Sequence, residues 1–228
     1  MLHFEVLTLF PGIFSSFLEE GLINRAIVES KLKVNLVNFR KNGLGKQLKV
    51  DDAPYGGGPG MVLRVEPIAN TLAQQNKDHL AAGRKIHSIL VTPQGQTFDQ
   101  EKARELSQRK EVITLICGRY EGFDERIRNL VDEEISGGDF ICLGGEVIAM
   151  AIIEATGRLI PNFLGNHDST RQESFSQSML EFPQYTRPAS FGGMDVPKEL
   201  LSGNHKKIAD WRQEKAFKKT KTRRPDLL

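Results

Sequence analysis

The chain has 228 residues and a mass of 25.6 kDa, enough for one large domain or two small ones with a buried core. Hydrophobic residues make up 39% and charged residues 26% of it, which is typical of an ordered globular protein and excludes a disordered one. The net charge is +2, and no apolar run approaches the ~18 residues of a membrane span. Only two cysteines occur, which excludes a disulfide scaffold and a cysteine-rich zinc site. A reducing cytoplasm is therefore the expected compartment.

Strand-like and helix-like patterns alternate through the first 160 residues. Residues 3–9 alternate as a strand does, and the acidic Glu5 in this segment argues against a signal peptide. Residues 15–30 carry apolar side chains at helical spacing, with Ser15 available as the N-cap. Further strands are predicted at 33–39, 87–92 and 111–117, and helices at 65–76, 99–108, 123–130 and 146–156. Strands that alternate with helices predict an α/β fold with a parallel sheet covered on both faces.

Residues 40–62 are predicted to form a glycine-rich loop, far longer than the usual connection of about 4–6 residues. Its segment DDAPYGGGPGM, at 51–61, holds four glycines and two prolines and is similar to a phosphate-binding loop. No G-K-[ST] sequence follows it, which disfavours a P-loop NTPase. No G-x-G-x-x-G follows a strand, which disfavours ordinary dinucleotide binding. Taken alone, the segment is interpreted as a tight structural turn.

Three further loops are more informative together: TPQG at 92–95, CGRYEG at 117–122 and SGGDFICLGGE at 136–146. The first two follow predicted buried strands, with PQG expected to turn the chain, and the third is expected to contain a strand within FICLGG. Ligands of open parallel sheets bind outside the carboxyl ends of the strands, and glycines there let a ligand approach the backbone. The three loops therefore predict a pocket for a small molecule.

After Arg158 the character of the chain changes. Residues 161–196 are rich in proline, glycine, asparagine and serine, and residues 197–219 are predicted to be helical, with Trp211 in the core of a small second domain. Between Lys206 and Arg224 the charge balance is +7, whereas the rest of the chain has a balance of −5. This asymmetry indicates either a phosphate-rich partner or a solvated helix face.

Metal and hydrolase motifs do not occur in the sequence. The five histidines share no metal-ligand spacing, and neither HExxH nor G-x-S-x-G is found. No metal site is therefore expected.

The loop motifs carry a resemblance that extends over essentially the whole chain. DAPYGGGPGM, TPQG, CGRYEGFDERI, DEEISGGDF, LGGE, FPQYTRP and SGNHKKIADWR occur in the order and spacing of the bacterial tRNA (guanine-N1)-methyltransferases, a family of the SPOUT superfamily. The resemblance implies a cytoplasmic homodimeric enzyme that transfers a methyl group from S-adenosylmethionine (SAM) to N1 of guanosine 37 of tRNA, next to the anticodon. It also implies a deep trefoil knot in the α/β domain, and active sites shared between subunits.

The resemblance further assigns domains and site residues. It implies a SAM-binding knot domain at 1–160, an interdomain linker or lid at 161–175, and a helical tRNA-binding domain at 176–228. The residues that match the family's SAM pocket are Leu90, Thr92, Pro93, Gly95, Gly118, Tyr120, Glu121, Gly122, Ser136, Gly137, Gly138, Asp139, Phe140, Ile141, Cys142, Gly144 and Gly145. Two positions depart from the family pattern, because proline is usual at Ile148 and a bulky aliphatic residue at Gly137.

The chemistry of guanine methylation indicates which groups the site needs. N1 of guanine carries a proton, so attack on a methyl group requires a base at N1 and a donor at O6, where negative charge develops. The resemblance assigns Arg158 as the donor and Glu173 as the base, where the family has aspartate. No metal is required by this mechanism, although activity in the family often depends on Mg²⁺.

Two other functions remain open at this point. The chain could be a SPOUT methyltransferase that acts on another RNA position or on ribose, which would need no carboxylate at position 173. It could also be an RNA-binding protein without catalytic activity, for which the replacement of aspartate by Glu173 is the one supporting feature.

Overall fold

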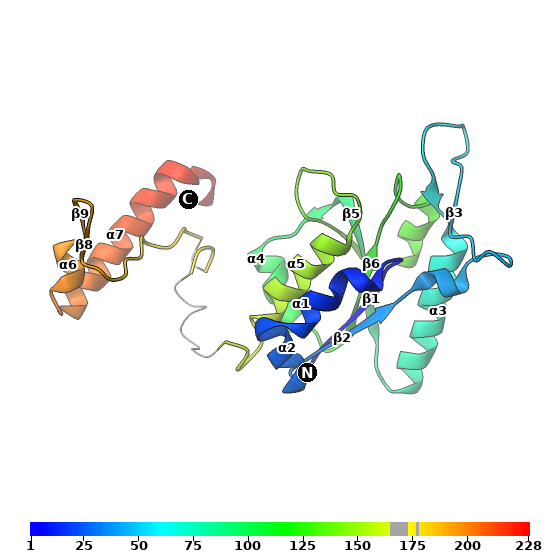
Figure 1. Ribbon diagram of the computed structural model, residues 1–228, viewed down its shortest axis with the longest axis horizontal. Helices are drawn as coiled ribbons and strands as arrows, with labels where there is room; N and C mark the ends of the chain where they lie inside the picture. The colour runs from blue at the N-terminus through cyan, green and yellow to red at the C-terminus, as the bar shows by residue number, and fades with distance from the viewer. Residues whose placement is uncertain (165–172, 177) are drawn as a thin grey trace. The chain divides into compact units, whose positions relative to one another are not determined.

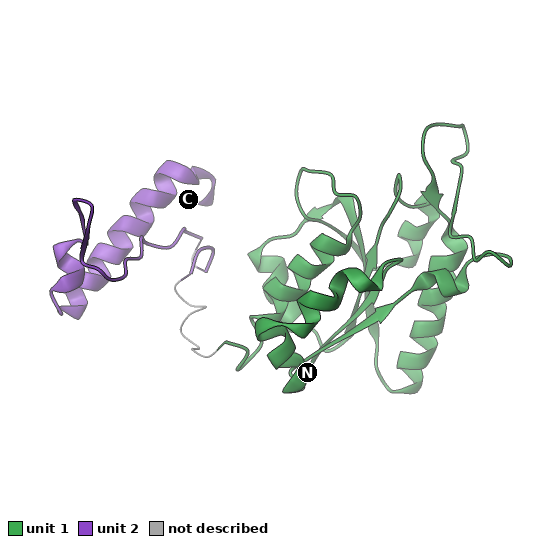
Figure 2. Ribbon diagram, viewed as in Figure 1, with its two compact units in different colours: residues 1–165 green, residues 166–228 purple. Residues whose placement is uncertain are grey.

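Two units make up the chain, Met1–Gly165 and Asn166–Leu228 (Figures 1 and 2). The computed structural model describes residues 1–164, 173–176 and 178–228. Most of the expected linker at 161–175 lies outside these described residues. None of the helices that the structure describes combines the length and the apolar character that crossing a membrane requires.

The first unit is built on a sheet of five parallel strands in the order β2-β1-β6-β5-β7. The prediction of an α/β fold with a parallel sheet is confirmed. Its strands are β1 (Leu2–Leu7), β2 (Leu32–Val37), β5 (Ile86–Thr97), β6 (Val112–Cys117) and β7 (Glu133–Ser136), with a short pair β3 (Asp51–Asp52) and β4 (Val62–Leu63). Its helices are α1 (Ser15–Glu19), α2 (Gly21–Val28), α3 (Val65–Ala81), α4 (Gln100–Ser107) and α5 (Glu146–Gly157), with 3-10 turns at Pro11–Phe14, Phe39–Asn42 and Glu125–Leu130.

Each face of the sheet carries its own core, because successive side chains of a strand point to opposite faces. In β1, Phe4 and Val6 belong to a core that α2, α4 and α5 cover. Leu7 belongs to a second core, covered by α3 and the 3-10 turns at 39–42 and 125–130. Figure 1 shows α1, α2 and α5 on one side of the sheet and α3 on the other. The carboxyl ends of the strands are left for loops, and the candidate site lies there.

Several predicted boundaries were wrong for local reasons. PQG does not turn the chain: β5 continues to Thr97, with an irregularity in its pairing to β7 between Val91 and Gln96. FICLGG contains no strand, since the strand of that region is β7, which comes before it. The helix at 15–30 is two helices that meet at Gly21, whose φ is +65°, and Ser15 is the first residue of α1 and not its N-cap.

The second unit is a small helical body with one hairpin. It contains the strands β8 (Ser190–Phe191) and β9 (Met194–Asp195), the helices α6 (Lys198–Leu201) and α7 (His205–Arg223), and a 3-10 turn at Pro225–Leu227. The single helix predicted at 197–219 is therefore interrupted, and Gly203 lies in the interruption with φ of +68°. Trp211 is only 7% exposed, which confirms its predicted place in the core of this unit.

Candidate functional site

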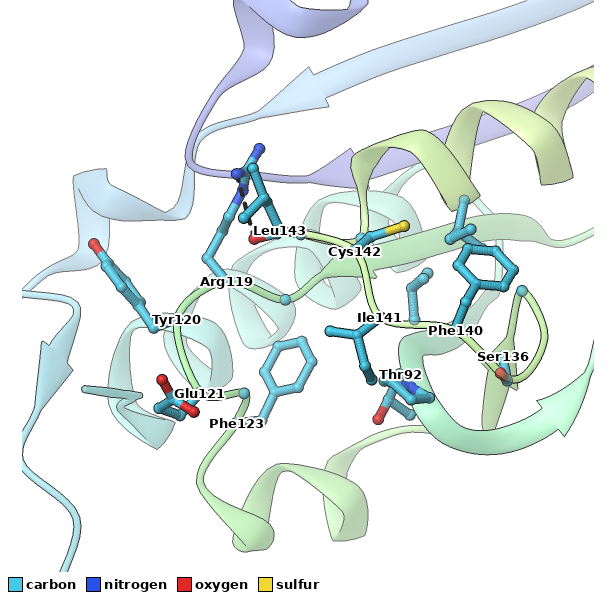
Figure 3. Close-up of a pocket in the computed structure, with 18 of the residues that line it drawn as sticks. Thr92, Arg119, Tyr120, Glu121, Phe123, Ser136, Phe140, Ile141, Cys142 and Leu143 are labelled. Atoms are coloured by element: carbon cyan, nitrogen blue, oxygen red, sulfur yellow. Dashed lines mark hydrogen bonds between the residues drawn. The ribbon is translucent and has the colours of Figure 1, made fainter. Parts of the chain in front are cut away.

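A cavity of about 370 Å³ lies at the carboxyl ends of β6 and β7 and beside the irregular part of β5. The three glycine-rich loops that follow or interrupt these strands form its walls. Its apolar lining includes Phe123 and Ile141, which lie beside Thr92 in Figure 3. This volume falls within the range of about 300–1,000 Å³ that is usual for small-molecule sites.

The loop after β6 forms one wall, and its backbone is held in an unusual conformation. Tyr120 has φ of +61° and Gly122 has φ of +112°, both in the left-handed region. A tyrosine in this region is uncommon and costs on the order of 1–3 kcal/mol, so the surrounding structure must impose it. The backbone N–H of Glu121 donates to the carbonyl of Met61 at 2.9 Å, and that of Leu63 donates to the carbonyl of Gly122 at 2.9 Å.

These two bonds bring the segment at 51–61 next to the cavity loop, a contact that the sequence did not reveal. A Cβ at Gly60, whose φ is +79°, would lie 2.4 Å from Cγ of Glu121, so the place where the two loops touch favours glycine. The segment does not itself line the cavity. Gly60 therefore serves the close approach of the two loops, whereas a Cβ at Gly56 or Gly57 would meet nothing within 4 Å.

The loop after β7 forms the opposite wall. Ser136 begins it, and its hydroxyl lies 3.1 Å from the backbone N of Gly138, which donates to it. A Cβ at Gly137 would lie 2.4 Å from Cδ1 of Ile148, so the isoleucine side chain occupies the space that a side chain at 137 would need. The two departures from the family pattern are thus in contact with each other and compensate in volume.

The two walls are joined through their backbones. The N–H of Gly145 donates to the carbonyl of Gly118 at 3.0 Å, and Arg119 pairs with Gly144 in an isolated antiparallel bridge. A Cβ at Gly145 would lie 3.0 Å from Cα of Cys117. Burial, with a smaller contribution from the negative charge of Glu146, raises the pKa of the Cys117 thiol well above its usual range. Cys117, which is buried next to the wall residue Gly118 and does not itself line the cavity, is therefore uncharged.

Fourteen of the seventeen predicted pocket residues line this cavity. The other three are Leu90, Gly95 and Asp139. Leu90 is buried in the core on the α3 face, and Asp139 is exposed. Gly95 packs against the backbone of β7, where a Cβ would lie 2.5 Å from the carbonyl carbon of Glu134. The lining residues that were predicted are Thr92, Pro93, Gly118, Tyr120, Glu121, Gly122, Ser136, Gly137, Gly138, Phe140, Ile141, Cys142, Gly144 and Gly145.

Five lining residues were not predicted: Val91, Arg119, Phe123, Leu143 and Ile148. All but Ile148 lie within or directly beside the three loop motifs. Their position in or next to a motif could therefore have identified them as lining residues. Ile148 lies in the first turn of α5, a helix that was predicted to begin at residue 146, but the side of this helix that faces the cavity was not predicted.

The two predicted catalytic residues lie in different units. Arg158 follows the C-terminal end of α5 and lines a separate cavity of about 420 Å³, with residues of α1 and α2. Glu173 belongs to the second unit, is partly buried, and accepts a hydrogen bond at its backbone carbonyl from the hydroxyl of Ser176 at 2.6 Å. Asp168, another carboxylate of the expected linker, lies outside the described residues.

A search for metal ligands among the described residues finds no group of three or more His, Cys, Asp or Glu side chains arranged to hold an ion. The cavity instead offers backbone N–H and C=O groups, apolar surface and few charged side chains. Such a lining suits an organic molecule that combines apolar surface with hydrogen-bonding groups.

Comparisons with known proteins agree over the whole chain. The sequence model of the family described as "tRNA (Guanine-1)-methyltransferase TrmD" matches residues 2–228. A tRNA (guanine-N(1)-)-methyltransferase of Syntrophotalea carbinolica is 49% identical over 229 residues, which cover 100% of this chain and 90% of that relative. Proteins of the same name from Lactiplantibacillus plantarum and Mesomycoplasma hyopneumoniae are each 49% identical, covering 100% and 98% of this chain and 91% and 94% of their own lengths.

Proposed function

Because the chain belongs to the tRNA (guanine-1)-methyltransferase family, we infer that it is an enzyme that transfers a methyl group to N1 of a guanine in tRNA. The match over residues 2–228 carries this conclusion. The names of the relatives specify the base and the ring nitrogen, so they favour this activity over methylation of ribose or RNA binding without catalysis.

We propose that the methyl donor is SAM and that it binds in the cavity of the three glycine-rich loops. When bound, SAM supplies an electrophilic methyl group on a sulfonium centre. The glycines of the walls support this assignment, because Gly118, Gly137 and Gly144 line the cavity without a Cβ that would keep a ligand away from their backbone. Thr92 and Ser136 add hydroxyl groups, and Phe123 and Ile141 add apolar surface for an adenine ring.

We propose that Glu173 and Arg158 act on the guanine. Glu173 would take the proton from N1, and Arg158 would donate hydrogen bonds to O6, where negative charge accumulates. A glutamate has one methylene more than the family's aspartate, but it supplies the same acceptor. The proton acceptor and the cation suffice for this step, and Mg²⁺ is not needed in it.

The position of Arg158 supports a homodimer with shared active sites. The cavity lies at the N-terminal end of α5, whereas Arg158 follows its C-terminal end. A helix of 12 residues is about 18 Å long, so Arg158 is remote from the cavity of its own subunit. We therefore propose that each site combines the cavity of one subunit with Arg158 of the other.

The remaining assignments follow from the resemblance and from the charge distribution. We propose that the target is guanosine 37, that the loops around the cavity form a trefoil knot, and that residues 161–175 cover the site. The basic helix α7 supports a role of the second unit in binding tRNA phosphates, because its last turn carries Lys221 and Arg223. The free thiols of Cys117 and Cys142 fit the cytoplasm.

Labelled SAM and unmodified tRNA test the proposed activity. After incubation with the enzyme, the tRNA is digested and the labelled nucleoside is identified. We expect 1-methylguanosine. A 2′-O-methyl nucleoside would point to another SPOUT activity, and the absence of transfer would favour an RNA-binding protein without catalytic function.

A further inference from the structure

A buried carboxylate lies behind the cavity wall. Glu146 is the first residue of α5 and is 1% exposed. Its Oε1 accepts a hydrogen bond from the hydroxyl of Thr8 at 2.7 Å and another from Nε of Arg119 at 3.1 Å. Its Oε2 lies 3.0 Å from Nη2 of Arg119, an ion-pair distance. A buried carboxylate is strongly disfavoured unless it is paired, so Glu146 depends on both partners.

Arg119 connects this carboxylate to both walls of the cavity. It belongs to the loop after β6, and its Nη1 donates to the carbonyl of Leu143 in the loop after β7 at 3.4 Å, a bond drawn as a dashed line in Figure 3. Its guanidinium carbon also lies 4.6 Å from the centre of the Phe10 ring, in the segment after β1. One side chain therefore links three segments that are distant in the sequence: its own loop, the segment at Phe10 and the segment at 143–146.

The ion pair packs directly against a residue that lines the cavity. A Cβ at Gly144 would lie 2.3 Å from Nε of Arg119 and 2.5 Å from Oε2 of Glu146. The pair thus fills the space on the protein side of Gly144 and limits where its backbone can lie. The N-terminal end of α5 also favours a negative charge at Glu146, because the helix dipole is positive there.

We propose that Glu146 is a positioning residue for SAM binding: together with Thr8 it fixes Arg119, and Arg119 holds the loops at 118–122 and 139–145 in the shape that binds SAM. The inference rests on the proposed function, because SAM is the ligand of that activity. Glu146 and Thr8 are not among the residues that line the cavity, so they would act on the ligand through Arg119 and Gly144.

Calorimetric titration of the full chain with SAM tests this role. We expect Glu146→Gln to weaken SAM binding by about tenfold or more, because it removes a charge-assisted pair, and Thr8→Val to weaken it by several-fold. Thr8→Ser keeps the hydroxyl and should restore the wild-type Kd. In assays, KM for SAM should rise more than kcat at saturating SAM falls.

A matched control separates positioning from stability. Glu5 is also a buried carboxylate of the first unit, and it accepts hydrogen bonds from Asn35 and Gln75 on the α3 face of the sheet. Both Glu5→Gln and Glu146→Gln should lower Tm, but Glu5→Gln should leave the Kd for SAM unchanged.

Wild-type SAM affinity in folded Glu146→Gln and Thr8→Val would overturn the proposal. If Glu146→Gln does not fold, the comparison of Thr8→Val with Thr8→Ser decides it alone. A wild-type chain that binds no SAM would overturn the proposed function, and this inference with it.

Discussion

Glu173 is the proposed base, and methyl transfer depends on it because N1 of guanine must lose a proton. Glu173→Gln keeps the size and hydrogen-bonding capacity of the side chain but removes its basicity. We expect single-turnover methyl transfer to fall by about 10²–10⁴-fold, with SAM binding little changed.

Glu173→Asp is the control for this substitution, because it restores the residue that is usual in the family. Activity in Glu173→Asp and its loss in Glu173→Gln would show that the site needs a carboxylate. If Glu173→Gln transfers methyl at the wild-type rate, Glu173 is not the base, and Asp168 becomes the candidate.

Single residues also show which parts of the site could be predicted from the sequence. The glycines of the three loops indicated a ligand at strand ends, and most of them line one cavity. The contact of Gly137 with Ile148 could not be foreseen, because it depends on how α5 packs against the loop after β7. The helix predicted at 146–156 already separates Arg158 from the loop at 136–146, but that the cavity lies at the N-terminal end of α5 came from the structure.

At the scale of elements, β1 and α3 hold a polar cluster that makes stability depend on pH. His79 of α3 and His3 of β1 each place Nε2 3.3 Å from Oε1 of Glu5. Burial lowers the pKa of His79, with Arg84 and His3 adding to the effect and Glu5 opposing it. Burial tends to raise the pKa of Glu5, but hydrogen bonds from His3 and Asn35 and the charges of both histidines outweigh it and leave that pKa lowered.

The lowered pKa values of His79 and Glu5 both make the folded state less stable as pH falls. A histidine with a lowered pKa stabilises the fold above its unfolded pKa of about 6.5, and a glutamate with a lowered pKa does so above about 4.3. The free energy of unfolding by urea should therefore decrease from pH 7 to pH 4. His79→Gln should reduce the slope of the free energy of unfolding against pH between pH 7 and pH 5, by at most about 1.4 kcal/mol per pH unit. An unchanged slope in His79→Gln would rule out this histidine as the cause.

The helix α7 carries the prediction about nucleic acid. Lys218, Lys221 and Arg223 are exposed on it, whereas Lys219 donates to the carbonyl of Glu181 and Arg224 pairs with Asp226. Replacing the three exposed residues by glutamine should weaken tRNA binding and reduce the slope of log K against log salt by about one unit per lost phosphate contact.

Lys77, Lys85 and Lys110 provide a matched control for these changes. They are exposed as well, and Lys85 and Lys110 come just before β5 and β6, at the opposite end of the strands from the cavity. Their replacement by glutamine removes the same charge and should leave the slope unchanged. Equal slopes for the two triple variants would mean that α7 is only a solvated face.

The elements themselves were predictable where their hydrophobic period was regular. β6 and α5 follow the predicted patterns closely, since both are largely buried. The end of β5 was missed because Gly95 allows the strand to continue against the backbone of β7, a contact between segments about 40 residues apart. The breaks at Gly21 and Gly203 depend on backbone angles, which an apolar pattern that continues through a glycine does not reveal.

For the whole molecule, the proposed sharing of sites between subunits predicts complementation between two inactive variants. Arg158→Ala leaves the cavity of its subunit intact, and Gly145→Val would push the two walls apart while leaving Arg158 intact. A heterodimer of the two variants should contain one complete site. Co-expressed and purified as a mixed dimer, it should regain up to about half of the wild-type activity, whereas each variant alone stays inactive.

Sites confined to one subunit would give no recovery in the mixed dimer. A monomeric mass for the wild-type chain by light scattering would also contradict the shared site.

We propose that this chain methylates N1 of guanosine 37 of tRNA with SAM as the donor. Methyl transfer from labelled SAM to two tRNA transcripts that differ only at position 37, guanosine in one and adenosine in the other, tests it most directly. We predict labelled 1-methylguanosine at position 37 of the first transcript and no label in the second. Equal labelling of both transcripts, or label in a ribose-methylated nucleoside, would contradict the account.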